Sequence, residues 1–350
     1  MIQVGIAGMG FMGVTHFDAW SKVKEATVSA ICTRDEKKLA GDWSTVQGNF
    51  GGSGGVRDLG DINRYPSLDD LIKDDRLDLL DLCLPTPMHP DTTVAALEAG
   101  RHVLVEKPIS VDLADADRMI AAAKASGRKL MVAHVLKFVP QFAHLAKIRD
   151  SGIFGQLVAL NLRRIISIPD WSKEIGDFPA NGGPLIDLHI HDIDFILFLL
   201  GPPRRLQSMG REQDGVIVYV STNYEYANGP QVSCQSGAVS MSSRPFLHEY
   251  EACFERATVR FSEVTEPGGV SESGARRTAS QVLTIYQNDG SVSYPDMADA
   301  DGFHLQLQHV ADCLTNESMG CMIGAESARD ALALAYLEDK SVRSGSMVDV

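Results

Sequence analysis

The sequence predicts an α/β protein of two domains. A doubly wound parallel sheet is followed by an α+β domain with a large, mostly antiparallel, open-faced sheet. Two observations indicate this. Strands alternate with helices up to about residue 134, and long runs with period-two alternation follow. In addition, 350 residues are too many for one compact domain. We therefore expect domains at 1–134 and 135–350.

The first part has the rhythm of repeated strand–helix units. Strands are expected at 2–7, 27–32, 78–84, 102–105 and 129–133, and helices at 12–24, 67–74, 90–99 and 111–126. Pro90 suits a first helical turn and Gly100 a helix end, while Ser67 and Ser110 are plausible N-caps. The glycine-rich segment 41–64 breaks the rhythm. It lacks the Lys-Ser/Thr pair of a phosphate loop, so we expect a flexible surface insertion.

The second part has a different texture. A helix is expected at 140–151, strands at 157–166, 216–226, 232–241 and 250–261, and helices at 184–200, 303–314 and 325–340. The strands offer more sheet than these helices can cover on both faces. A bare face of that size is normally buried by a partner, so we expect a homodimer or homotetramer built through this sheet.

Composition narrows the classes of function. The net charge of −14 argues against a nucleic-acid partner, and no apolar run is long enough to span a membrane. The first residues resemble a strand rather than a signal peptide. The six cysteines are scattered without a C-x-x-C pair, as expected for free thiols in a reducing compartment. These features predict a cytoplasmic protein.

A glycine fingerprint opens the chain. Gly8, Gly10 and Gly13 form G-x-G-x-x-G directly after the apolar run 2–7, and Phe11 and Met12 lie between the glycines where a helix begins. Such glycines permit a tight turn, let the backbone approach a pyrophosphate and let the helix pack on the strand. The free N–H groups of the helix end attract the phosphates. A glycine-rich turn without a ligand is the alternative, but strand, turn and helix in register favour a dinucleotide site.

Two further strand ends carry candidate site residues. Leu84, Pro85 and His89 follow one expected strand, and Glu106 and Lys107 follow another. Ligands of doubly wound sheets lie outside the carboxyl ends of strands, so these five are candidate cofactor-binding residues. A lysine there can anchor a substrate hydroxyl or help to move its proton, although a solvated surface lysine is the alternative.

The segment 182–194 holds an acid–base pattern. On one helix Asp187, His191 and Asp194 fall at i, i+4 and i+7, on one face, where they could perform general acid–base chemistry. One alternative is a metal pair of His189 with His191, which needs a strand because the rings diverge on a helix. The other is a structural His191 bonded to Asp187. We expect no metal.

These motifs together resemble the Gfo/Idh/MocA oxidoreductase family. The resemblance rests on the fingerprint, the strand end with His89, the Ala-Gly-x-His-Val-x-x-Glu-Lys-Pro segment that ends at Pro108, and Gly-Gly-x-x-x-Asp-x-x-x-His over 182–191. It implies a Rossmann domain and an α/β domain whose open sheet serves oligomerisation. It also implies that Lys107, Asp187 and His191 are catalytic. The chain departs from the pattern in the 41–64 insertion and in having His189 where many members have glycine.

The resemblance implies hydride transfer between a nicotinamide and a sugar, polyol or related carbonyl. His191 would exchange the hydroxyl proton, Lys107 would stabilise the oxygen, and Asp187 would orient the pair. All three are expected to line one cleft, with His134 and Trp171 as weaker candidates for its wall. The alternatives are an NAD-dependent glycosidase of the same fold and a non-catalytic nucleotide-binding sensor.

The residues after the second strand bear on the choice of cofactor. Thr33 and Arg34 occupy the position, about 20 residues past the fingerprint, that usually meets the adenine ribose. An acid there would repel a 2′-phosphate, whereas Arg34 could pair with it. Asp35 is counter-evidence, because a small loop shift could bring it to the ribose. We expect NADP(H), with NAD(H) as the alternative.

Overall fold

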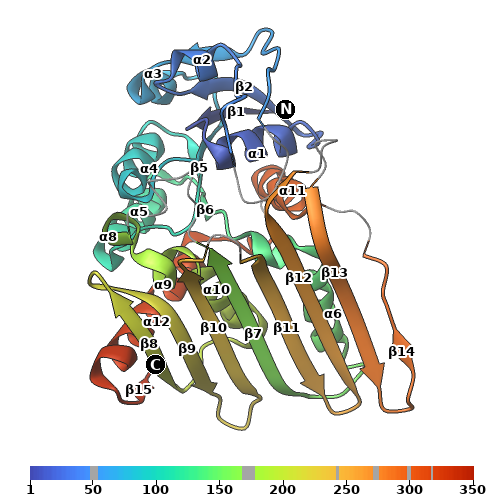
Figure 1. The fold of residues 1–350 in the computed structure, drawn as a ribbon. Coiled ribbons are helices and arrows are strands. Elements are labelled where there is room, and N and C mark those ends of the chain that lie inside the picture. Colours follow the sequence, from blue (N-terminus) through green and yellow to red (C-terminus); the bar gives the residue numbers. More distant parts are fainter. Residues whose placement is uncertain (48–53, 168–177, 242–243, 271–275, 298–300, 317) are drawn as a thin grey trace. The chain divides into compact units, whose positions relative to one another are not determined.

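The computed structural model describes residues 1–47, 54–167, 178–241, 244–270, 276–297, 301–316 and 318–350 (Figure 1). The chain folds into two compact units. The first contains Met1–Val135 and Asp301–Asp330, and the second contains Leu136–Ala300 and Ala331–Val350. The segment Asp301–Asp330 therefore packs with the first unit, whereas the sequence predicts a single boundary after residue 134.

The first unit is built on a six-stranded sheet in the order β3-β2-β1-β4-β5-β6, and every pair of neighbours is parallel. Its strands are β1 (Ile2–Ala7), β2 (Ala26–Cys32), β3 (Asn63–Tyr65), β4 (Leu79–Leu82), β5 (His102–Val105) and β6 (Leu130–Val132). This confirms the doubly wound sheet. Strand order reverses between β1 and β4, which creates the crevice where such sheets bind ligands. The sequence did not predict β3, whose three residues are too few to show a period.

Helices connect these strands and return to the unit near the end of the chain. They are α1 (Phe11–Trp20), α2 (Glu36–Leu39), α3 (Leu68–Lys73), η1 (Thr86–Met88), α4 (His89–Glu98), α5 (Leu113–Ser126) and α11 (Gly302–Thr315). Gly100 has the expected left-handed conformation, with φ 82°, just after α4. Ser110 is not an N-cap: α5 is capped by Asp112, whose carboxylate accepts a hydrogen bond from the Ala114 N–H.

The described parts of the 41–64 insertion pack against the first unit. Trp43 is fully buried, and its ring meets that of Phe17 edge-on at 4.8 Å. Its indole N–H donates to the Lys38 carbonyl at 2.8 Å, and Arg57 pairs with Asp18 of α1 at 3.2 Å. The prediction of a flexible surface insertion is wrong for these residues, because the buried tryptophan ties the segment to the unit. Residues 48–53 lie outside the described part.

The second unit is built on a nine-stranded sheet in the order β14-β13-β12-β11-β7-β10-β9-β8-β15, in which only β7 and β10 pair in parallel among the described strands. Its strands are β7 (Leu157–Ser167), β8 (Arg205–Gln213), β9 (Val216–Glu225), β10 (Gln231–Val239), β11 (Phe246–Phe254), β12 (Ala257–Val270), β13 (Arg276–Gln287), β14 (Val292–Ser293) and β15 (Val348–Asp349). The mostly antiparallel sheet is confirmed. The single strand expected at 250–261 is wrong: it is the end of β11, a turn and the start of β12.

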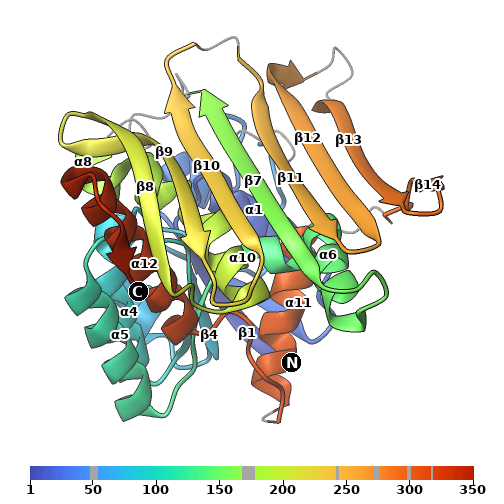
Figure 2. The ribbon, with the colours of Figure 1, turned by 90° about the horizontal axis from the view of Figure 1, so that it is seen from below.

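The helices of this unit lie on one face of the sheet. They are η2 (Val135–Phe138), α6 (Pro140–Ser151), α8 (Phe178–Asn181), α9 (Gly183–Asp187), α10 (Ile190–Leu200) and most of α12 (Ala325–Ser344). Both ribbon views show α6 and α10 behind the sheet (Figures 1 and 2). No helix among the unit's described residues covers the opposite face in either view. Across the described chain, no helix is long and apolar enough to cross a membrane.

Candidate functional site

The parallel sheet of the first unit brings most of the predicted cofactor residues to one edge. Gly8, Thr33, Leu84, Glu106 and His134 each follow a strand within two residues, after β1, β2, β4, β5 and β6 respectively. Since all these strands point the same way, their carboxyl ends share one edge of the sheet. His134 is buried there.

The three glycines of the fingerprint are needed for different structural reasons. Gly8 has a φ of 93° and donates its N–H to the Cys32 carbonyl at 2.9 Å, which closes the turn after β1. A Cβ on Gly13 would lie 1.9 Å from the Gly8 carbonyl oxygen, so this glycine lets α1 pack on the turn. A Cβ on Gly10 would meet no atom within 4 Å. The space beside Gly10 is therefore open, and a loop whose backbone binds a pyrophosphate needs such a space.

His89 ties together the two loops that follow β4 and β5. Its ring is fully buried, with Nδ1 2.9 Å from the Pro108 carbonyl and Nε2 2.9 Å from the Leu84 carbonyl. Burial lowers the pKa of His89, and the contacts with the two carbonyl oxygens oppose this shift. His89 therefore positions the loops rather than presenting a ring nitrogen to a ligand.

The residues that these loops present are more accessible. Pro85 is exposed and Lys107 is half-buried. The Lys107 N–H donates to Oε2 of Glu106 at 3.1 Å, so the glutamate folds back on its own loop.

The loop after β2 separates Arg34 from Asp35. Asp35 is the N-cap of α2, and its Oδ1 accepts the N–H groups of Lys37 and Lys38 at 2.9 and 3.1 Å. Its carboxylate is thus engaged in the fold. Arg34 is exposed, and within the described part of the chain its guanidinium has no hydrogen bond or ion pair.

In the second unit, Asp187 ends α9 and His191 lies in the first turn of α10. The single helix expected at 184–200 is therefore wrong. The chain passes between α9 and α10 through a wide turn in which the His189 N–H donates to the Pro184 carbonyl, five residues back, at 2.9 Å. Such π-type turns are frequent at functional sites. Asp187 and His191 are half-buried, whereas most of their neighbours are buried, and Nδ1 of His191 is itself buried.

The buried neighbours of His191 anchor α10 to three other elements. Asp192 forms a two-pronged ion pair with Arg164 of β7, at 2.8 and 3.0 Å. His189 bridges Ser236 of β10, at 2.7 Å, and Glu338 of α12, at 2.9 Å. The two ring nitrogens of His189 thus face Ser236 and Glu338, and the helical backbone does not favour a metal pair of His189 with His191.

Asp194 has a different role from the one that its spacing suggests. It pairs with Lys137 of η2 at 2.9 Å, and both side chains are 2 % exposed. A shared catalytic face of Asp187, His191 and Asp194 is therefore wrong, since the ion pair holds Asp194 inside the unit.

Strand register explains how the buried polar network forms. Arg164 of β7 lies directly opposite both Ser236 of β10 and His248 of β11. The three side chains point to the helix-covered face of the sheet, where they meet Asp192 of α10. Arg164 donates to Nε2 of His248 at 2.6 Å, so His248 is a neutral acceptor in this contact.

Sequence reasoning missed Lys137, Arg164 and Glu338 as partners of the α10 segment. Alternation does place Arg164 among buried strand residues, which is the one signal available. Trp171, expected at the wall of the cleft, lies outside the described residues.

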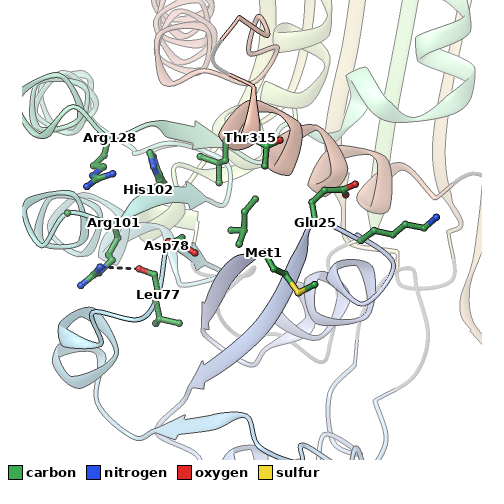
Figure 3. A pocket seen from close by; sticks show the side chains of 12 residues that line it. Met1, Glu25, Leu77, Asp78, Arg101, His102, Arg128 and Thr315 are labelled. Atoms are coloured by element: carbon green, nitrogen blue, oxygen red, sulfur yellow. Dashed lines mark hydrogen bonds between the residues drawn. The ribbon is translucent and has the colours of Figure 1, made fainter.

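A cavity of about 710 Å³ opens at the opposite edge of the first sheet, where its strands begin. Figure 3 shows Arg101, His102 and Arg128 gathered on one side and Glu25 on the other, and Arg101 donates to the Leu77 carbonyl at 3.1 Å. This is the wrong edge for a dinucleotide, since the fingerprint lies at the carboxyl ends of the strands.

Comparison with known proteins agrees with this architecture. The family described as "Oxidoreductase family, NAD-binding Rossmann fold" matches residues 2–134, and the GFO/IDH/MocA C-terminal domain matches residues 142–260. Among solved structures, aldose-aldose oxidoreductase from Caulobacter crescentus superposes with a TM-score of 0.80 at 20 % identity, covering 100 % of this chain and 99 % of that one. At that identity the likeness shows the fold alone.

Two curated relatives extend the comparison. Myo-inositol 2-dehydrogenase of Thermotoga maritima is 27 % identical over 57 % of this chain and 55 % of its own length. Trans-1,2-dihydrobenzene-1,2-diol dehydrogenase of Oryctolagus cuniculus is 25 % identical over 79 % of this chain and 85 % of its own length. The chain spans about half the length of the first curated relatives that it matches. The family matches cover both units, with the nucleotide-binding edge in the first and the anchored Asp187–His191 segment in the second, and the chain therefore belongs to the Gfo/Idh/MocA oxidoreductase family.

Proposed function

We propose that this protein is a nicotinamide-dependent oxidoreductase that interconverts a hydroxyl and a carbonyl group of a sugar, polyol or related compound. The observation that carries the proposal is the anchoring of α10. Three buried polar contacts fix the helix that presents His191, while His191 and Asp187 stay accessible. Such fixed placement is what an acid–base group needs, because proton transfer depends on geometry.

The residues have distinct roles in this proposal. When bound, the nicotinamide accepts or supplies the hydride. His191 takes the proton of the reacting hydroxyl during oxidation and returns it during reduction. Lys107 donates a charged hydrogen bond to the same oxygen, which stabilises its developing negative charge. Asp187 orients the pair electrostatically.

For the cofactor, we propose a preference for NADP(H) over NAD(H). Asp35, the only acid next to Arg34 in the loop after β2, already caps α2. The exposed Arg34 guanidinium is available to a 2′-phosphate, for which its planar donor group is suited. The similar proteins include both cofactors in their names. One curated relative is D-xylose 1-dehydrogenase (NADP(+)) 2 of Haloferax volcanii, and one similar solved structure is a complex with NAD+.

For the assembly, we propose a homodimer or homotetramer through the open face of the second sheet. Its outward side chains are mainly polar: Asn161, Arg163, Asn223, Gln235, Glu251 and Arg260. The exposed Met209, Val282 and Tyr286 add apolar area. A partner would thus be held by a mixed surface. Light scattering at micromolar concentration tests this, and a monomer would contradict it.

The reaction is tested by nicotinamide absorbance with NAD and NADP against polyols, aldoses and keto-sugars. The proposal expects net formation of reduced nucleotide with at least one hydroxyl substrate. Glycoside cleavage with tightly retained nucleotide and no net turnover would instead favour an NAD-dependent glycosidase. Nucleotide binding without either reaction would favour a sensor.

A further inference from the structure

A buried histidine lies beneath the nucleotide-binding edge of the first unit. His16 is on α1, one turn after the fingerprint, and is 0 % exposed. Its Nδ1 lies 2.9 Å from Oδ2 of Asp81, and its Nε2 lies 3.2 Å from Oε1 of Glu106. One imidazole thus sits between two carboxylates that come from β4 and from the loop after β5.

Asp81 is an unusual residue for its position. It is fully buried in β4, whose other residues are all leucines, Leu79, Leu80 and Leu82. The Trp20 indole N–H donates to its Oδ2 at 2.8 Å, and the Cys83 thiol lies 3.6 Å from its Oδ1. A buried carboxylate is costly unless it is paired and hydrogen-bonded, and these contacts supply the partners.

The charges of the cluster do not cancel. Burial alone would lower the pKa of His16, but the Asp81 carboxylate beside it raises this pKa well above the usual value, so the imidazole is protonated. Burial raises the pKa of Cys83, which stays a neutral thiol. The ring of Phe303 from α11 lies near the imidazole, at 6.2 Å between centroids, and adds no charge. Two carboxylates and one imidazolium leave one excess negative charge.

The two partners of His16 differ in how they hold it. The contact with Asp81 is a hydrogen bond, whereas Nε2 lacks a hydrogen-bond partner of good geometry and meets Glu106 only as an ion pair. Glu106 also accepts the N–H of Lys107. The attraction to His16 and the hydrogen bond from the Lys107 N–H therefore both restrain the Glu106 carboxylate.

The position of the cluster relates it to one half of a dinucleotide. In doubly wound sheets a dinucleotide lies across the switch point, with one half over each set of strands. Thr33 and Arg34 follow β2 on the adenine side. Asp81, Cys83 and Glu106 belong to β4 and β5, on the other side, where the nicotinamide half would bind. The oxidised nicotinamide ring is a cation and the reduced ring is neutral.

We propose that His16 is a positioning residue that holds Glu106 beneath the nicotinamide half of the site, and that the excess negative charge of the His16–Asp81–Glu106 cluster favours the oxidised over the reduced cofactor. The inference rests on the proposed function only in taking the bound dinucleotide to be a nicotinamide. A cluster that served stability alone would not need two acids around one histidine, because apolar residues stabilise the rest of β4 at lower cost.

The test measures dissociation constants of the oxidised and reduced nucleotide by calorimetric titration at fixed pH and salt. Glu106→Gln removes the excess charge. It should raise the ratio of the oxidised to the reduced dissociation constant by roughly threefold to tenfold, the scale of one charge at short range in a protein. His16→Gln leaves Glu106 without its cation and should weaken both forms severalfold, the reduced form more, because the excess negative charge of the cluster grows. Asp74→Asn, a buried polar change in the same unit away from this edge, is the control and should alter neither constant.

Two results would overturn the inference. Equal weakening of both forms in Glu106→Gln would show that the charge does not discriminate between them. Wild-type-like constants in His16→Gln would show that the histidine does not position the glutamate. If His16→Gln fails to fold, Glu106→Gln still decides the charge. Because every readout is binding, a protein that turns over no hydroxyl substrate would contradict the proposed reaction and leave this test intact.

Discussion

A Cβ atom on Gly13 would lie 1.9 Å from the carbonyl oxygen of Gly8, a distance that no packing adjustment of side chains can relieve. The turn after β1 and the first turn of α1 therefore touch backbone to backbone. At Gly10, between them, the same added atom would meet nothing within 4 Å, and the backbone φ of −86° suits any residue. Gly8 and Gly13 are thus needed for the fold, whereas Gly10 leaves open space beside the backbone.

Alanine substitutions should separate these two purposes. Gly10→Ala should fold with a melting temperature close to that of the wild type and lose nucleotide affinity by at least tenfold, because its methyl group occupies the approach of a pyrophosphate. Gly13→Ala should lower the melting temperature clearly, because the backbone must shift. Thermal melts and nucleotide titrations on both variants check this. Unchanged nucleotide affinity in a folded Gly10→Ala protein would remove the steric argument for a dinucleotide site.

The parallel strands were predictable because each is a short apolar run followed by turn residues, as at Ala7–Gly8. The turn between β11 and β12 was not. Its Glu255 and Arg256 carry no glycine, proline or asparagine signal, so nothing in the residue types marks a turn there. The buried positions do change phase across these two exposed residues, and the expected single strand overlooked that change.

The site residues divide in the same way. Lys107 and His191 stand in local motifs that the sequence displays directly. Their supports depend on pairings between distant positions, such as Lys137 with Asp194 or His189 with Glu338, which are 57 and 149 residues apart. Period and composition give no information on such pairings. The packing of the 41–64 insertion was also missed. Its glycines indicated a flexible loop, although Trp43 is fully buried.

Lys107 and His191 should both be needed for turnover. Lys107→Ala and His191→Ala are each expected to reduce kcat by about 100-fold or more, the usual scale for losing a positioned acid–base or charge-stabilising group. Nucleotide binding should survive His191→Ala, because His191 belongs to the substrate side, and Asp187→Asn should cost less. Steady-state kinetics and nucleotide titrations measure these effects. A His191→Ala protein with a near-normal rate on its true substrate would leave the family membership as fold alone.

Arg34 should set the preference between the two nicotinamide cofactors. Arg34→Asp replaces a cation that can pair with the 2′-phosphate by an anion that repels it, so NADP(H) affinity should fall far more than NAD(H) affinity. Arg204→Asp makes the same charge change on an exposed residue of the second unit and serves as the control. Binding titrations with both cofactors give the comparison. Tighter binding of NAD(H) than of NADP(H) by the wild type would contradict the prediction.

His248 should make the second unit sensitive to mild acid. Burial first, and then the Arg164 guanidinium, lower the pKa of His248 to about 4. An unfolded histidine has a pKa near 6.5, so between about pH 6.5 and 4 the unfolded chain binds a proton that the folded chain refuses. The contribution of this group to stability is therefore present near neutral pH and is lost as the pH falls through that window, by up to about 3 kcal/mol.

The matched variant for this prediction is His248→Gln, which keeps an acceptor for Arg164 and does not titrate. Urea unfolding followed by far-ultraviolet circular dichroism at pH 7, 6, 5 and 4.5 should show a smaller loss of stability in the variant than in the wild type. His144→Gln, at a half-buried position on α6, should retain most of the wild-type slope.

His16 and His189, whose pKa values are raised by neighbouring carboxylates against the effect of burial, contribute stability that is lost at higher pH. The wild type and both variants share this opposite contribution to stability, so it cancels when their acid slopes are compared. Equal acid slopes for the wild type and His248→Gln would mean that His248 already carries its proton in the folded state, and that Arg164 does not donate to it.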